Sequence, residues 1–294
     1  ASGSSPTLEG ARTCAACEAT TREQDRRQIL IPAGFAVDLH QEPHNDVTRQ
    51  RYVPVESPWI SGRGDWQPLV DPDCGRVRAA ADGHVLHQSR GEFEQGYAIC
   101  LACGRAEPMP AQGNTPKLLS EPHQRLRGSR RVDGICPGSR SDWLIKPGLT
   151  LAHEAITDVA ELQLKTPDGL WLADTETART LAVALRGGLA RALGIQATEL
   201  GCETKAARSP EGAAIRSIVL FDRYAAGYAS SVPRLLAATF RHAAQQLDCP
   251  AHCDAACPEC VLEFDQRFAA AQLNRHKALS VLTPAWLDRL VHAG

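Results

Sequence analysis

The chain has 294 residues, of which 43% are hydrophobic and 22% are charged, and its formal net charge at pH 7 is −2. These values are typical of a globular protein with room for about two domains, and they exclude a globally basic nucleic-acid-binding protein but not a local basic patch. No apolar run approaches the ~18 residues of a membrane-spanning helix, so we expect no membrane partner. The eleven cysteines form an odd set with several C-x2-C pairs, which favours metal binding in a reducing cytoplasm over disulfides.

The chain begins with a segment of small residues, which we expect to be flexible over residues 1–28. It contains Cys14 and Cys17, a C-x2-C pair that is either half of a metal site or two idle thiols. Residues 29–145 have the loop residues and short apolar runs of a β-rich region. Within it, residues 77–87 predict two strands that are joined by a turn at Asp82-Gly83.

A zinc knuckle is indicated by Cys100-Leu-Ala-Cys103-Gly104. Gly104 supplies the positive φ that such a turn needs, and cysteine thiolates are preferred zinc ligands. The remaining two ligands are either His123 and Cys136 or the distant Cys14 and Cys17. We favour His123 and Cys136.

Between these knuckle halves lies the most cationic segment of the chain, which contains Arg125, Arg127, Arg130 and Arg131. Arginines on a loop beside a zinc knuckle can hold phosphates and so position DNA. The alternative is a solvated loop, or one paired with acids elsewhere.

Residues 146–294 predict a mixed α/β domain. Leucines at every fourth position follow Asp174-Thr175 and end before Gly194, which is the pattern of a capped helix. Residues 215–221 are mostly β-branched or apolar, as in a strand buried on both faces. Two further strands are expected at 144–156 and 159–164. Three further helices are expected: one that Ser231 and Pro233 begin and that ends at Leu247, one over 273–282 and one over 284–290.

Four cysteines, Cys249, Cys253, Cys257 and Cys260, stand within twelve residues after the expected helix. Four nearby thiols satisfy a tetrahedral zinc ion, so we predict a structural zinc site on a tight turn, and one or two zinc ions in all. Two alternatives remain open. The last three cysteines have the spacing of a radical iron–sulfur enzyme, and all four could be disulfides or buried thiols.

Motifs for catalysis are absent from this sequence. It contains neither a P-loop nor a nucleophile elbow. A metal-dependent nuclease could use Asp158, Glu161 and Lys165, but Gln163 occupies the position where an acid is expected. We therefore expect a protein that is not itself an enzyme, and read these three as strand residues.

Several of these segments together resemble a known family. They are Tyr97–Arg105, Leu151–Val159, Val219–Asp222 with Gly227-Tyr228, the four-cysteine cluster, and Leu273-Asn274-Arg275 with Ala278-Leu279. In this order they are similar to the zinc-binding C-terminal region of MrfA-like helicases and helicase-associated proteins, and most of all to the DrmB-type component of DISARM anti-phage systems.

This resemblance implies that Cys249, Cys253, Cys257 and Cys260 hold one structural zinc ion. It also implies a non-catalytic accessory module in anti-phage defence or DNA repair, with DNA and a helicase or translocase motor as partners, the motor being in the same protein or on another subunit. Two positions depart from the family pattern, Ala226 in place of a glycine and Asn274 in place of an aspartate. We expect an α+β protein, with a β-rich zinc-knuckle region followed by a mixed α/β domain.

Overall fold

The chain folds into two compact units. The computed structural model describes residues 12–13, 20–21, 28–32, 45, 56–125, 134–136, 142–263, 265 and 270–291. Unit 1 comprises Ala1–Thr13, Thr20–Trp59 and Leu86–Glu154, and unit 2 comprises Cys14–Ala19, Ile60–Val85 and Ala155–Gly294. The α+β class expected from the sequence is confirmed. The domain boundary near residue 145 stays a prediction.

Unit 1 is built around short strands. β7 (Tyr97–Cys100) pairs antiparallel with β8 (Ala106–Pro108) and with the beginning of β11 (Ile145–Leu164), where Ile145 lies opposite Cys100. β9 (His123–Gln124) and β10 (Ile135–Cys136) form a separate antiparallel pair. The small core of this unit is formed by Ala98, Cys100, Met109, Leu119 and Cys136. Other elements with residues in this unit include β1 (Arg12–Thr13), β2 (Thr20–Thr21), β3 (Ile29–Leu30), β4 (Trp59–Ser61) and α1 (Lys117–Ser120).

Unit 2 contains a sheet in which the strand predicted over residues 215–221 is an interior strand. β13 (Ala214–Asp222) pairs antiparallel with β12 (Leu200–Arg208) on one side and with β11 on the other. Its Ile218 and Leu220 join the main core, and its Val219 and Phe221 pack with a second apolar cluster. Burial on both faces is therefore confirmed. The sheet continues through β6 (Gly75–Ser89), to which β5 (Gln67–Pro68) also pairs.

One sequence prediction in this sheet is wrong. The turn predicted at Asp82-Gly83 does not form, because residues 75–89 are one continuous strand. A Cβ atom added to Gly83 would lie 2.3 Å from Cγ2 of Val159, far inside van der Waals contact. Glycine is needed here for close approach to the neighbouring strand β11 rather than for a turn.

The two strands predicted at 144–156 and 159–164 are also one strand. β11 runs from Ile145 to Leu164 with one irregularity, where its pairing with β7 shifts register between Lys146 and Leu149. Gly148 within this shift has φ +72°, which glycine adopts at low cost. The strand therefore passes through a bulge-like distortion near its beginning, and it continues without interruption through residues 157–158, where the sequence predicts a break.

The two long helices of unit 2, α2 (Thr175–Leu193) and α3 (Val232–Leu247), confirm the predicted boundaries. α2 begins at Asp174, whose Oδ2 accepts a hydrogen bond from the backbone N–H of Thr177 at 2.8 Å, and ends at Gly194 in the left-handed conformation. Because the capping side chain satisfies an otherwise unpaired N–H, the helix start is fixed locally. The hydrogen bonds from the Thr177 hydroxyl and N–H lower the pKa of Asp174.

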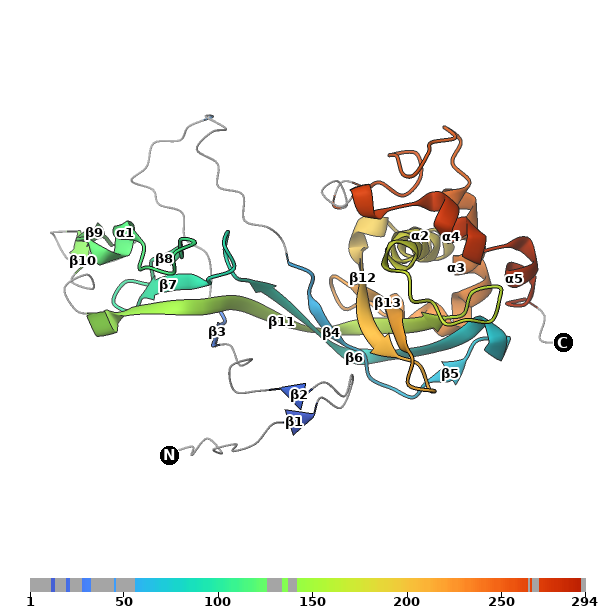
Figure 1. The fold of residues 1–294 in the computed structure, drawn as a ribbon, viewed down its shortest axis with the longest axis horizontal. Helices are drawn as coiled ribbons and strands as arrows, with labels where there is room; N and C mark the ends of the chain where they lie inside the picture. Colours follow the sequence, from blue (N-terminus) through green and yellow to red (C-terminus); the bar gives the residue numbers. More distant parts are fainter. Residues whose placement is uncertain are drawn as a thin grey trace. The chain divides into compact units, whose positions relative to one another are not determined.

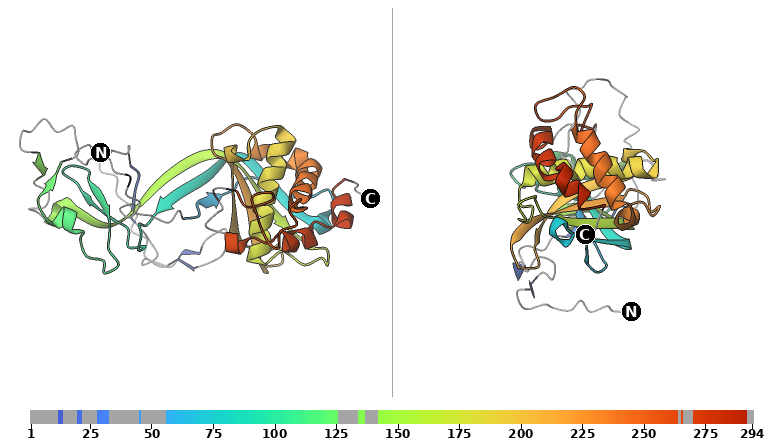
Figure 2. Two further views of the ribbon diagram at one scale, coloured as in Figure 1. Left: turned by 90° about the horizontal axis from the view of Figure 1, so that it is seen from above. Right: turned by 90° about the vertical axis from the view of Figure 1, so that its right-hand side faces the viewer.

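α3 packs closely against α2 and ends just before Cys249, the first of the four cysteines at 249–260. Leu236, Phe240, Ala243 and Leu247 are buried on its core face, as predicted. A Cβ atom on Gly188 of α2 would lie 2.2 Å from the carbonyl oxygen of Thr239, so only glycine permits this helix–helix approach. Figures 1 and 2 show α2, α3 and α4 on one face of the sheet strands β12 and β13.

Two short helices complete unit 2. They are α4 (Arg275–Val281) and α5 (Pro284–Asp288), each within the range that the sequence predicts. Trp286 of α5 is 1% exposed and stacks at an angle against Phe240 of α3, with 5.3 Å between ring centroids. Among the helices that the structure describes, none has the length and apolar character needed to cross a bilayer.

Candidate zinc sites

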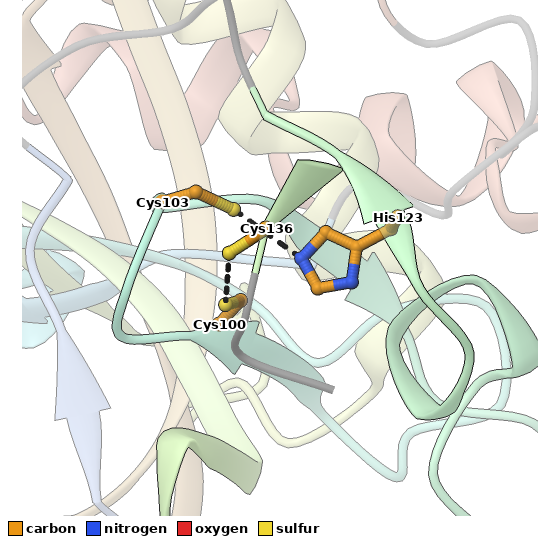
Figure 3. A group of neighbouring side chains, drawn as sticks. All are labelled: Cys100, Cys103, His123 and Cys136. Atoms are coloured by element: carbon orange, nitrogen blue, oxygen red, sulfur yellow. Dashed lines mark hydrogen bonds between the residues drawn. The ribbon is translucent and has the colours of Figure 1, made fainter. Parts of the chain in front are cut away.

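The first cluster consists of Cys100, Cys103, His123 and Cys136, whose ligand atoms lie within 4.8 Å of one another. Figure 3 shows the four side chains converging on one point. Cys100 ends β7, and Gly104 turns the chain after Cys103 with φ +79° and an N–H that donates to the Cys100 carbonyl at 2.7 Å. His123 and Cys136 are register partners across β9 and β10. Strand pairing therefore places these two ligands side by side.

The separations in this cluster fit a single zinc ion. Sulfur atoms at the corners of a tetrahedron with Zn–S bonds of about 2.3 Å are about 3.8 Å apart. Sγ of Cys100 lies 3.6 Å from Sγ of Cys136, and Sγ of Cys103 lies 3.4 Å from Nε2 of His123. A disulfide would require about 2.05 Å. Nδ1 of His123 faces the carbonyl of Glu121 at 3.3 Å, a contact that leaves Nε2 free to bind metal.

The second cluster consists of Cys249, Cys253, Cys257 and Cys260. Its residues form turns after the end of α3, as the sequence predicts. The Sγ–Sγ distances are 3.5 Å between Cys249 and Cys257, 3.7 Å between Cys253 and Cys260, and 3.8 Å between Cys257 and Cys260. These are again the edges of a tetrahedron around one ion, and they are too short to enclose an iron–sulfur cluster of several metal atoms. Each cluster therefore fits one zinc ion, which gives one or two zinc ions per chain.

Thiol ionisation in the second cluster differs from one ligand to the next. The backbone N–H of Cys253 lowers the pKa of Cys249 to about 6, whereas burial raises the pKa of Cys253 to about 12. In the first cluster, burial raises the pKa of Cys103 to about 12. Zinc binds thiolates, so metal binding must displace protons from the thiols that are otherwise neutral.

His252 is the strained position of the second cluster. It has φ +49°, and it is exposed, between Cys249 and Cys253. Residues other than glycine rarely adopt this backbone conformation, and its energetic cost is largest for β-branched residues. We expect His252→Val to lower the free energy of unfolding of the zinc-loaded protein by about 1–2 kcal/mol, while His252→Gly leaves it unchanged or raises it slightly.

Thermal unfolding of both variants tests this expectation. Ala251→Val is the matched control, because Ala251 is an exposed neighbour whose φ is negative. Equal losses for His252→Val and Ala251→Val would contradict a conformational origin.

The predicted DNA-binding arginines are only partly described. Arg125 donates its backbone N–H to the Gly134 carbonyl at 2.7 Å and its Nε to the Ile135 carbonyl at 3.1 Å. It therefore braces the β9–β10 pair. Arg127, Arg130 and Arg131 lie outside the described residues, as do Cys14 and Cys17.

The three residues considered for a nuclease have other partners. Glu161 is 2% exposed and lies 2.6 Å from Arg78 and 2.9 Å from Lys205. Burial acts to raise its pKa, but the two cations hold that pKa below its ordinary value. Asp158 accepts the N–H of Gly227 at 3.1 Å, and Lys165 lies 3.6 Å from Asp73. Within the described part of the chain, Asp158 and Glu161 belong to no group that could hold a metal ion.

The two positions expected to depart from the MrfA-like pattern, Ala226 and Asn274, both have local backbone roles. Asn274 caps α4, because its Oδ1 accepts from the N–H groups of His276 and Lys277. The N–H of Ala226 donates to Asp222, which also accepts from Tyr228 and Ala229. Gly227 alone in this turn has a positive φ, +82°. Alanine therefore fits at position 226.

Sequence reasoning missed three polar residues that support the second cluster. Arg186 is 1% exposed within α2 and bonds to Glu263 and Asp265, which follow the cluster. Arg275 and Gln246 donate to backbone carbonyls of the cluster itself. One signal for Arg186 was available, a single arginine within the apolar run of residues 181–190.

Comparison with known proteins finds a similarity in part of this chain. The sequence profile of the MrfA Zn-binding domain matches residues 181–261. No curated protein sequence matches the chain. A solved structure that matches is the "Crystal Structure of DUF1998 helicase MrfA bound to DNA", with 14% identity, a TM-score of 0.42 and coverage of 79% of this chain. The chain spans 25% of the length of that helicase chain. The region from the middle of α2 to the last ligand of the second cluster is thus similar to the MrfA Zn-binding domain.

Proposed function

We propose that this protein is a non-catalytic, zinc-stabilised accessory module of a helicase or DNA-translocation complex. The match of residues 181–261 to the MrfA Zn-binding domain and the two tetrahedral ligand sets support this proposal. Cys249, Cys253, Cys257 and Cys260 would hold one zinc ion, and Cys100, Cys103, His123 and Cys136 the other. The motor would be elsewhere in the same protein or on a partner. A cytoplasmic role in anti-phage defence or DNA repair, as in the DrmB-type components, is part of the proposal.

One observation carries the DNA-binding part of the proposal. His123 and Cys136 are paired across β9 and β10, and Arg125, Arg127, Arg130 and Arg131 all lie between them in the sequence. Zinc bound by His123 and Cys136 would hold together the two ends of the arginine-rich segment that connects them. Such a connection can bind phosphates, which supply most of the affinity of sequence-independent DNA binding. Docking of the motor without DNA binding is the alternative outcome of the test.

The test is a DNA-binding titration at several salt concentrations. We expect the change of all four arginines to alanine to weaken binding and to reduce the slope of log affinity against log salt by about 0.9 for each DNA phosphate that the variant no longer neutralises. Zinc content and thermal unfolding of the variant are measured alongside, because Arg125 also braces β9 and β10.

A matched control uses arginines outside this connection. Arg191, Arg234 and Arg241 are exposed on α2 and α3, and changing all three to alanine removes a similar charge. Two results would rule out this connection as the DNA-binding segment. One is an unchanged salt dependence of DNA affinity in the variant that lacks Arg125, Arg127, Arg130 and Arg131, and the other is an equal loss of affinity in the control variant. Iron in place of zinc, or DNA cleavage by the purified chain, would instead contradict the assignment as a non-catalytic zinc module.

A further inference from the structure

The four ligands of the second cluster are carried by a segment without regular secondary structure. Residues 248–262 form turns held by short-range bonds such as the Cys260 N–H to the Cys257 carbonyl at 3.0 Å. Turns of this kind do not by themselves fix the distance between ligands that are distant in the segment. The spacing of Cys253 and Cys260 must therefore depend on contacts with the helices around them.

Two side chains from different helices supply these contacts. Nε2 of Gln246, on α3, donates to the carbonyl of Cys260 at 2.8 Å. Nε of Arg275, on α4, donates to the carbonyl of Cys253 at 2.7 Å, and its Nη1 to the carbonyl of Leu247 at 3.4 Å. The backbone N–H of Arg275 also donates to the Ala255 carbonyl at 2.7 Å. Each end of the ligand segment is thus tied to a helix.

Arg275 has a second property that points to a bound anion. Arg275 is 7% exposed, and the hydrogen-bond acceptors of its side chain among the described residues are neutral backbone carbonyls. Among the described residues, no carboxylate forms an ion pair with it. A buried cation is costly unless an opposite charge lies near it. Zinc with four thiolates carries a net charge of −2, and Cys253, whose carbonyl Arg275 holds, is one of the four candidate ligands.

We propose that Gln246 and Arg275 are positioning residues of the Cys249–Cys260 zinc site. Both set the ligand spacing through backbone carbonyls, and Arg275 additionally offsets the negative charge of the zinc–tetrathiolate centre. Space for Gln246 comes from Gly187 of α2, where a Cβ atom would lie 2.1 Å from Oε1 of Gln246. The assignment rests on the zinc-binding part of the proposed function and is independent of DNA binding.

The first experiment measures zinc affinity by competition with a chromophoric chelator. Removing a partner that orients metal ligands typically weakens metal binding about 10–100-fold, and we expect a loss in this range for Arg275→Met. Arg275→Lys keeps the charge and should lose less. Gln246→Leu removes the hydrogen bond to the Cys260 carbonyl but no charge, so its loss of zinc affinity should also be smaller than that of Arg275→Met. Arg78→Met, which removes a half-buried arginine paired with Glu161, should leave zinc affinity unchanged.

The second experiment is a double-mutant cycle that separates charge compensation from simple packing. In the zinc-loaded protein, Arg275→Met should lower the unfolding temperature. In a Cys257→Ser background that lacks this zinc ion, the same change should have little effect or raise it, because the anion is gone while the burial cost of the cation remains. Arg78→Met should cost the same in both backgrounds.

The outcomes are distinguishable from failure of the zinc assignment. The difference in zinc content between the unmodified protein and Cys257→Ser tests the assignment itself, because the first cluster is unchanged in both proteins. Where zinc is present, equal costs of Arg275→Met in the two backgrounds together with unchanged zinc affinity would overturn the role of Arg275. Unchanged affinity in Gln246→Leu would overturn that of Gln246.

Discussion

Replacing Cys257 with serine is expected to remove one zinc ion per chain and to destabilise unit 2 by about 4 kcal/mol when zinc is supplied at about 1,000 times its dissociation constant. In zinc-finger peptides, structural zinc supplies about 10 kcal/mol or more, because the apo peptide is unfolded. Here most of the apolar core is formed by α2, α3 and the sheet, outside the cysteine cluster, and we expect it to remain folded without zinc. The loss of stability should therefore be smaller than in a finger, and activity should fall only as a consequence of unfolding.

Elemental analysis and thermal unfolding, with and without a chelator, measure this effect. Cys74→Ser is the matched control, since Cys74 is 0% exposed but belongs to neither cluster. Burial raises the pKa of Cys74 to about 11, as expected for an inert thiol. The control should keep its full zinc content, and a chelator should lower its unfolding temperature as much as it lowers that of the unmodified protein. Equal zinc content in Cys257→Ser and the unmodified protein would contradict the assignment.

The second large effect is expected at the acids that pair with Arg186. In the structure the Arg186 side chain is 1% exposed, and Glu263 and Asp265 each lie 2.6 Å from its guanidinium. Changing Glu263 to Gln and Asp265 to Asn together removes both negative charges and leaves the buried guanidinium unpaired with either of them. Removing one side of a buried ion pair costs about 3–5 kcal/mol. The lower end is expected, because the two acids are themselves 26% and 36% exposed and partly screened by water.

Arg186→Met should cost less than the double change. It removes the buried charge itself, and the two acids that remain can be hydrated. Denaturant unfolding of the three proteins gives the order. Asp82→Asn serves as control, because Asp82 and its partner Arg63 are both more than half exposed, and such a pair contributes about 1 kcal/mol or less. A larger loss of stability in Arg186→Met than in the double variant would contradict this account.

Local features of this protein could be predicted from its sequence. The beginning and end of α2 follow from Asp174 and Gly194, which act on backbone groups within one turn of themselves. The second cluster was predicted as a set because its cysteines are close in sequence. For the first cluster the sequence leaves two ligand sets open, and the structure brings together Cys100, Cys103, His123 and Cys136.

Features that depend on distant residues could not be predicted. Asp82-Gly83 has the composition of a turn, but the proximity of Val159 makes it part of a strand. Arg186 finds its acids nearly eighty residues away, and Arg275 finds the carbonyl of Cys253 from the following helix. The sequence alone determined the candidate ligands of the second cluster and where α2 and α3 begin and end, because those depend on residue type and short spacing. Only the tertiary structure decided which buried charges and glycines support the sites, because a partner or a steric contact exists only after the chain has folded.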